Sequence, residues 1–395
     1  MPWMETHVWE ERMKFVLARR GEDCPMTELC AVYGISRKTG YKWLERYEAR
    51  GVAGLRDGSR ARRTQARRTD PRLAALAIAL RQRHPHWGPR KLRAVLRRRH
   101  PHQAWPAAST LGALLQRHGL IAARRRRRPA AATPTALTVA TAPNAIWAAD
   151  FKGWFRTRDG ERCDPLTMSD LYSRYLLRCA AVAPTGTRAV WPVFASAFRE
   201  YGLPQAIRTD NGPPFASTGL GGLSRLAVWW IRLGIRPERI TPGAPQENGS
   251  HERMHRTLAA EVTRPPRRNR AAQQRAFQHF RQEFNQERPH EALGQRVPAA
   301  LYHPAPRPYP RRLPPVEYPA HLEVRRVRQA GEIKWRGRFL YLSQALIGEP
   351  VGLEPVSERH WRVSFATYPL ALLDDATGRL HPYRRARRRP IGARS

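Results

Sequence analysis

Cysteine is scarce in this chain of 395 residues, and no apolar run is long. The four cysteines, Cys24, Cys30, Cys163 and Cys179, are too few for a disulfide framework, which fits a reducing cytoplasm. The longest uninterrupted apolar run spans residues 73–80, far short of the ~20 residues that cross a bilayer. The first residues are charged and lack the apolar stretch of a signal peptide. We therefore expect neither a membrane protein nor a secreted one.

Acidic residues are also few. Asp and Glu together number 32 against 71 Lys and Arg, which gives a net charge of +39. Such a charge requires a polyanion, and nucleic acid is the usual one. An anionic membrane surface is the alternative, but no basic amphipathic helix stands out. Cys24 and Cys30 do not have the usual spacing of zinc ligands, so we interpret them as small buried residues.

The length suggests two or three domains, and 41% hydrophobic residues are enough for folded cores. Prolines (35) and glycines (27) indicate linkers between them. We expect the following order: a helix–turn–helix domain (1–55), a linker (56–70), a second helix–turn–helix-like domain (71–123), a basic linker (124–143), an α/β catalytic core (144–303), a Pro-rich linker (304–320), a small β-barrel (321–385) and a basic tail (386–395).

The first 50 residues have the pattern of a helix–turn–helix. A helical stripe covers residues 5–19, Thr27 is a suitable N-cap for a short helix, Gly34 permits a tight turn, and Ser36 can cap a third helix. That third helix carries a basic face, as in helices that enter the major groove. The alternative is a helical bundle with a solvated basic face. The candidate DNA-binding residues are Arg37, Lys38, Thr39, Lys42 and Arg46.

A second helical unit follows the first linker. Pro71 opens a predicted helix that ends at Arg83, Pro89 opens another, and residues 106–118 form a third. The run of five arginines at 124–128 is predicted to be an extended segment that contacts phosphates, although such runs are often merely solvated.

From residue 144 the pattern becomes mixed α/β and then all-β. The predicted strands and helices of the core are 144–155, 166–183 and 205–209 (strands) and 187–201, 223–233 and 270–287 (helices), with a further helix around Glu252. Alternating segments from residue 321 onward predict a small antiparallel β-barrel.

Three carboxylates in the core are candidates for chemistry. Asp150 lies on a strand among apolar residues, Asp210 ends a strand before Asn211-Gly212, and Glu252 lies in the first turn of a helix. Each alone has an ordinary interpretation, a turn residue or a partner of the helix dipole. Together, in a DNA-binding protein, they indicate a site for two Mg²⁺ or Mn²⁺ ions, which prefer oxygen ligands and assist phosphodiester chemistry.

The strings WAADFKG, IRTDNGPPFAS and PQENGSHERMHRTL resemble the catalytic core of retroviral integrases and of DDE insertion-sequence transposases, which have an RNase H-like fold. The third string, with GISRKTGYKWLERY and HEALGQRVPAALYHP, is closest to insertion-sequence group four-eighty-one. The resemblance covers most of residues 5–305. It implies that Asp150, Asp210 and Glu252 are both the catalytic residues and the metal ligands.

The same resemblance implies a bacterial, nucleoid-associated transposase that binds element ends and target DNA as a homo-oligomer. Water, activated by metal, would free a 3′-OH that then attacks target DNA. Lys152 and Arg256 are candidate phosphate contacts, with solvated surface charge as the alternative. His255 could assist proton transfer or simply pack or touch DNA. Glu247 is rejected as the third carboxylate because it precedes the helix. Asp159, Asp164 and Asp170 are interpreted as structural.

Three other functions fit parts of the pattern. A DNA-binding regulator derived from a transposase would keep the helix–turn–helix domains but would not need the carboxylates. A nuclease or resolvase would not need end-specific binding. A protein that coats RNA or an anionic membrane would need no ordered trio of carboxylates.

Overall fold

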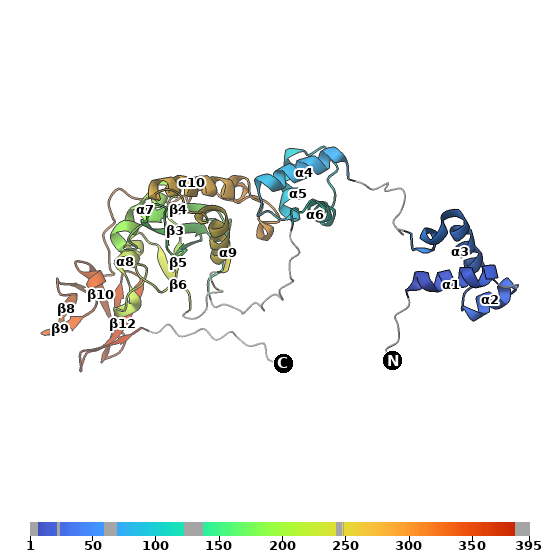
Figure 1. Cartoon of the computed structure of the whole chain (residues 1–395). Coiled ribbons are helices and arrows are strands. Elements are labelled where there is room, and N and C mark those ends of the chain that lie inside the picture. Colours follow the sequence, from blue (N-terminus) through green and yellow to red (C-terminus); the bar gives the residue numbers. More distant parts are fainter. Residues whose placement is uncertain are drawn as a thin grey trace. The chain divides into compact units, whose positions relative to one another are not determined.

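The computed structural model describes residues 7–21, 24–58, 69–121, 137–241, 247 and 249–383. The chain divides into two compact units, Met1–Thr69 and Asp70–Ser395 (Figure 1). The arginine run at 124–128 and the predicted basic tail lie outside the described residues. No helix among the described residues is long and apolar enough to span a bilayer.

The first unit is the predicted helix–turn–helix. Its elements are α1 (Val8–Gly21), α2 (Met26–Val32), α3 (Arg37–Arg50) and a 3₁₀ turn (Gly51–Leu55). Gly34 adopts φ +60° in the turn between α2 and α3. The Ser36 hydroxyl caps α3 by accepting from the Thr39 amide at 3.2 Å, as predicted. Thr27 is not the cap of α2, however, because Pro25 occupies the N-cap position and the helix has already begun at Met26.

The core of this unit forms where the three helices meet. Phe15 of α1, Leu29 of α2 and Trp43 of α3 are buried together. Gly40 lets α3 approach closely, since a Cβ there would lie 2.8 Å from the Cys30 sulfur. Cys30 is therefore a packing residue, as we interpreted it.

The second unit begins with a helical bundle of α4 (Pro71–Arg83), α5 (Pro89–Arg99) and α6 (Ala108–Arg117). We refer to it as the second helical bundle. Both predicted proline starts are correct, because each proline occupies the first turn of its helix. Trp87, Leu92, Leu111 and Leu115 are among its fully buried side chains.

A mixed six-stranded sheet follows. Its strands are β1 (Ile146–Phe151), β2 (Phe155–Arg156), β3 (Arg162–Asp170), β4 (Leu176–Val182), β5 (Ala206–Thr209) and β6 (Arg236–Arg239). Strand β1 pairs antiparallel with β3 and parallel with β5, and β5 pairs parallel with β6. Strands β2 and β4 both pair antiparallel with β3.

Four helices pack on this sheet, namely α7 (Thr187–Tyr201), α8 (Arg225–Arg232), α9 (Gly249–Leu258) and α10 (Arg270–Gln286). Helices α7 and α8 share an aromatic core with one set of strand residues, including Trp147, Phe198 and Trp229. Helices α9 and α10 pack on another set, where Leu258 and Phe277 contact the sheet near Leu176 and Cys179. The helix predicted to carry Glu252 is therefore a covering layer of the sheet.

The C-terminal region is all-β, but it is not the closed barrel that the alternating pattern predicted. Its strands are β7 (Glu323–Arg326), β8 (Glu332–Trp335), β9 (Arg338–Tyr341), β10 (Pro350–Pro355), β11 (His360–Phe365), β12 (Tyr368–Asp374) and β13 (Arg379–Pro382). Strand order is β13-β12-β11-β10-β7, with β8 and β9 as a separate hairpin. Among the described residues, the edge strands β7 and β13 do not pair with each other.

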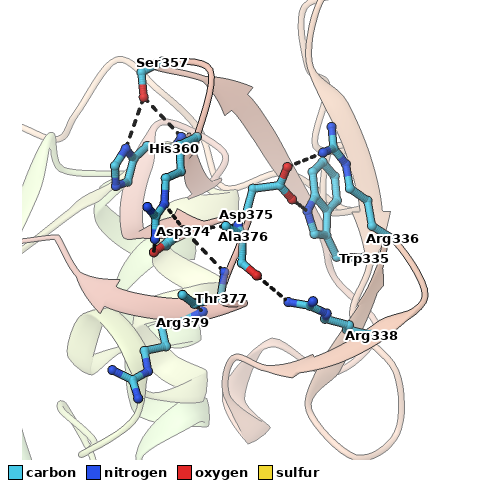
Figure 2. Close-up of polar contacts among 11 residues, drawn as sticks. Trp335, Arg336, Arg338, Ser357, His360, Asp374, Asp375, Ala376, Thr377 and Arg379 are labelled. Carbon is cyan, nitrogen blue, oxygen red and sulfur yellow. Dashed lines mark hydrogen bonds and ion pairs between the residues drawn. The ribbon is translucent and has the colours of Figure 1, made fainter.

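The sheet stays open because its apolar side chains are buried by other elements. Val351, Leu353 and Val363 share one core with Ala227 and Ile231 of α8 and with the β8–β9 hairpin. Figure 2 shows how the turn between β12 and β13 is fixed to that hairpin: Asp375 accepts from the Trp335 indole at 2.8 Å and from Arg336.

Candidate active site

Asp150 and Asp210 lie at the same end of two neighbouring parallel strands. Ala148 of β1 is level with Arg208 of β5 in the sheet register. Asp150 follows two residues later on β1, and Asp210 comes directly after the last residue of β5. The register therefore brings together two carboxylates that are 60 positions apart in the sequence.

Glu252 lies in the first turn of α9, which is attached to β3 next to Asp150. Thr167 is the register partner of Asp150 across the β1–β3 pair. The Thr167 hydroxyl oxygen lies 2.7 Å from Nε2 of His251 and 2.7 Å from Nε2 of His255, both on α9. The two histidines flank Glu252, so these contacts fix the position of the helix that carries it.

Thr167 and Ser169 share hydrogen bonds with the two imidazole rings. The Thr167 hydroxyl also lies 3.1 Å from the Asp150 carbonyl oxygen. A hydroxyl that donates to this carbonyl accepts from Nε2 of both rings, an arrangement that requires the Nε2–H tautomers. The Ser169 hydroxyl oxygen lies 3.0 Å from Nδ1 of His251. Burial lowers the pKa of both histidines, that of His255 to about 4.

Sequence analysis missed Thr167 and Ser169 and did not single out His251. Threonine and serine on a strand are common, and their partners are more than 80 positions away. The only available signal was the i, i+4 spacing of His251 and His255, which places both rings on one helix face.

The carboxylates repel one another. Burial and, to a smaller extent, the charges of Asp210 and Glu252 together raise the pKa of Asp150 to about 7. Burial also raises the pKa of Asp210, against one hydrogen bond from the Gly212 amide at 3.2 Å. Among the described residues, no Lys or Arg nitrogen lies within 4.0 Å of either carboxylate. Nδ1 of His255 lies 4.0 Å from Asp150, but its lowered pKa keeps this ring neutral near pH 7.

The other carboxylates of the core have local partners. Asp164 accepts two hydrogen bonds from the Arg162 guanidinium. Asp170 is fully buried and accepts from Ser173 and from the Asn144 amide. Asp159 accepts from Thr157, and Glu247 accepts from Thr241. These contacts account for all four as structural residues.

The described residues do not form a closed metal site. Across the ranges that the structure covers, no group of three or more His, Cys, Asp or Glu side chains is compact enough to hold an ion. Glu252 is exposed. Asp150, Asp210 and Glu252 thus interact through their charges without converging on one point.

The predicted DNA contacts of α3 divide into two groups. Arg37, Lys38 and Lys42 are exposed. The Thr39 hydroxyl lies 2.9 Å from that of Ser36, and the cationic groups of Lys42 and Arg46 lie 5.1 Å and 4.9 Å from the Trp43 ring centre. Thr39, Lys42 and Arg46 thus have intramolecular contacts, and Lys42 is nevertheless exposed, as are Arg37 and Lys38.

Lys152 and Arg256 are both in the second unit. Lys152 is half-buried, and burial together with the charge of Arg264 lowers its pKa. Arg256 is exposed on α9, on the wall of a cleft described below.

Comparison with known domains matches two parts of the chain. Residues 140–245 and 233–298 match the integrase core domain. Residues 11–63 match a helix-turn-helix domain, and residues 39–115 match a homeodomain-like domain. The predicted helix–turn–helix region and integrase-like core are therefore confirmed.

Two similar proteins come from insertion elements. The uncharacterized 31.7 kDa protein of insertion element IS407 from Burkholderia multivorans is 28% identical over 229 residues, which are 58% of this chain and 79% of that protein. The uncharacterized 39.2 kDa protein of IS476 from Xanthomonas euvesicatoria is 28% identical over 235 residues, 58% of this chain and 64% of that protein.

Among solved structures, the chain is similar to the HTLV-2 integrase catalytic core domain in complex with magnesium. The TM-score is 0.31 at 17% identity, over 41% of this chain and 99% of that one.

Proposed function

From an integrase core domain joined to helix–turn–helix domains, we propose that this chain is the transposase of an insertion element. It binds the element's ends and catalyses DNA strand cleavage and strand transfer as a DDE-type polynucleotidyl transferase. One observation supports this most directly. The chain has a net charge of +39, yet within its described ranges no Lys or Arg pairs with Asp150 or Asp210 at one end of the sheet.

The donor set fits divalent Mg²⁺ or Mn²⁺. Carboxylates that raise one another's pKa are stabilised by a cation, and oxygen ligands suit these hard ions. Asp150, Asp210 and Glu252 would hold two ions. When bound, the ions supply charge stabilisation and activate the attacking oxygen.

The chain's own residues position the reacting groups. Thr167, His251 and Ser169 hold α9 against β3, so that Glu252 stays beside the two aspartates. Lys152 and Arg256 contact phosphates. In cleavage, the oxygen of water bonds to the scissile phosphorus while the P–O3′ bond breaks, which leaves a 3′-OH and a 5′-phosphate. In strand transfer, that 3′-OH forms a P–O bond to a target phosphate while the P–O3′ bond of the target strand breaks and releases a new 3′-OH.

The DNA and the assembly follow from this function. Arg37, Lys38 and Lys42 of α3 contact the terminal repeat, and a homo-oligomer brings two ends together. The domain boundaries 1–55, 71–123, 144–303 and 321–385 belong to this proposal, as does membership of insertion-sequence group four-eighty-one. The protein acts at the bacterial nucleoid.

Strand cleavage and joining on a labelled duplex that carries the element's own end tests the proposal. The reaction is run with Mg²⁺, with Mn²⁺ and with EDTA. We expect metal-dependent nicking at the end, followed by joined products. End-specific binding without cleavage under either metal would refute the transposase and favour the alternative, a DNA-binding regulator derived from one.

A further inference from the structure

A cleft of about 490 Å³ lies between the second helical bundle and the catalytic core. Its wall includes Lys91 of α5, Arg174 of the turn after β3, Arg253 and Arg256 of α9, and Arg288 after α10. We refer to it as the basic cleft. Ser169 and Ser250 also line it, so the cleft borders the histidine contacts of α9 and the turn that carries Glu252.

The basic cleft exists because the second helical bundle packs against α10 and the segment after it. His84 Nδ1 lies 3.1 Å from Glu283 on α10. Arg99 pairs with Glu287 at 3.3 Å, and Arg90 pairs with Glu291. These contacts place α5 beside Arg288 and bring Lys91 into the wall.

The carboxylates in the wall are already engaged. Glu261 pairs with Arg288 at 2.7 Å, and Glu291 pairs with Arg90. Within the described residues, neither Lys91 nor Arg174 lies within 4.0 Å of a carboxylate oxygen. Burial and the charge of Arg288 lower the pKa of Lys91 to about 8, while burial and Arg253 lower that of Arg174. The wall thus carries five cationic side chains against two carboxylates, and both of these carboxylates are paired with arginines, so the cleft keeps an excess of positive charge.

Arg174 also has an unusual backbone. Its φ is +64°, a left-handed conformation that favours Gly or Asn over a long side chain. Arginine at this position places a guanidinium on the wall despite that cost. Unneutralised, partly buried cations gain most from an anion, and phosphate oxygens are the usual partners of Arg and Lys.

We propose that the basic cleft binds the phosphodiester backbone of a DNA strand. The second helical bundle and the core thus hold one strand between them, a contact separate from the DNA contacts proposed for α3. Backbone binding by the cleft does not depend on the transposase function.

Lys91→Gln and Arg174→Gln test the cleft, each in the full chain with Asp210→Asn so that no cleavage occurs. Arg225→Gln is the matched control, because Arg225 is an exposed arginine at the start of α8 and lies outside the cleft wall. Affinity for a labelled duplex is measured by anisotropy from 50 to 400 mM KCl. We expect each cleft variant to bind roughly tenfold more weakly and to lower the salt slope by about 0.9, the value for one lost phosphate contact. Unchanged affinity and slope in both cleft variants would overturn the proposal.

If the cleft variants misfold, a chemical footprint of the wild-type protein still tests the proposal. The chain has only six lysines, so amine acetylation read by mass spectrometry resolves Lys91 individually. DNA should protect Lys91, and Lys14, which pairs with Glu11 on α1, serves as the reference. Protection by inorganic phosphate at equal phosphate concentration would indicate a free-ion site and overturn the DNA assignment, as would acetylation of Lys91 unchanged by DNA. Loss of cleavage with protection intact would refute the transposase alone.

Discussion

Asp150 and Asp374 both lie at strand ends, and their pKa values move in opposite directions. Asp374, at the end of β12, accepts two hydrogen bonds from the Arg359 guanidinium at 2.8 Å, and this pairing lowers its pKa well below the usual range. Asp150 has no Lys or Arg partner in the part of the chain that the structure describes, and burial, with the charges of Asp210 and Glu252, raises its pKa to about 7. The C-terminal sheet thus uses Asp374 for structure, whereas no described Lys or Arg pairs with Asp150 or Asp210 in the core.

The difference is notable because the chain has 71 Lys and Arg that could pair with a carboxylate, and most other carboxylates of the core do have such a partner. An unpaired and partly buried aspartate lowers the stability of the folded state. Asp375, next to Asp374, is tied to Trp335 and Arg336 (Figure 2). Functional sites in many proteins lower the stability of the fold, and this contrast is consistent with the catalytic role that we propose for Asp150 and Asp210.

The largest expected effect is on cleavage. Asp210→Asn keeps the size of the side chain and removes its charge, so strand cleavage should fall by about 10³-fold or more, since metal-assisted charge stabilisation contributes several kcal/mol. DNA affinity should be retained. Cleavage is followed on an end-labelled duplex and affinity by anisotropy. Asp374→Asn is the control from the C-terminal sheet and should cleave at the wild-type rate. If both variants lost cleavage activity equally, Asp210 and Asp374 would not differ in role as we propose.

The second largest effect tests whether the contacts of α9 with β3 hold Glu252 in position. Thr167→Val removes the hydroxyl that binds both histidines and keeps the shape of the side chain, so Glu252 should lose its fixed position. We expect cleavage to fall by about 10- to 100-fold, as for other partners of metal ligands, and half-maximal activity to need more Mg²⁺. Thr167→Ser keeps the hydroxyl and should restore the metal requirement. If Thr167→Val had the Mg²⁺ dependence of the wild type, the contact of Thr167 with the two histidines would contribute to packing alone and not to the position of Glu252.

The sequence predicts most of this site because the elements that carry it have strong local signals. The α7 helix has the bounds predicted for it, and Ser36, Pro71 and Pro89 begin their helices as expected. Asp150 and Asp210 could be placed on or at the end of strands because β1 and β5 are short buried strands with a clear apolar signal, whereas the parallel pairing of β1 with β5 was not predicted.

Contacts between distant elements could not be predicted. Thr167 on β3 meets α9 only after the sheet and helix have packed, and nothing near Thr167 in the sequence marks it. The prediction of a closed C-terminal barrel was wrong for the same reason. Alternating residues predict an apolar face, but they do not predict whether α8 or another strand covers that face.

A smaller effect should appear in stability. The raised pKa of Asp150 means that the folded state disfavours its charge, so this residue destabilises the fold increasingly as pH rises from about 4 to 7 and fully above that. Asp150→Asn should therefore raise the free energy of unfolding at pH 8 in EDTA by on the order of 1–2 kcal/mol and change little at pH 4. Denaturant unfolding at the two pH values measures this. Added Mg²⁺ should stabilise the wild type more than the variant; a variant less stable at pH 8 would contradict the argument.

The smallest effect belongs to Asp374 and has the opposite sign. A carboxyl whose pKa is lowered on folding adds stability above its unfolded pKa, near 4, and loses it as the pH falls toward the folded value. Asp374→Asn should therefore lower the midpoint of thermal unfolding at pH 7 by about 2 °C or less, because the pair with Arg359 is near the surface. Near pH 2 the difference between the two proteins should be smaller, because the wild type has lost part of its stabilisation. Scanning calorimetry from pH 2 to pH 7 measures both. If Asp374→Asn instead stabilised the protein at pH 7, Asp374 would carry the same cost as Asp150, and pairing with arginine would not be what separates structural from catalytic aspartates in this chain.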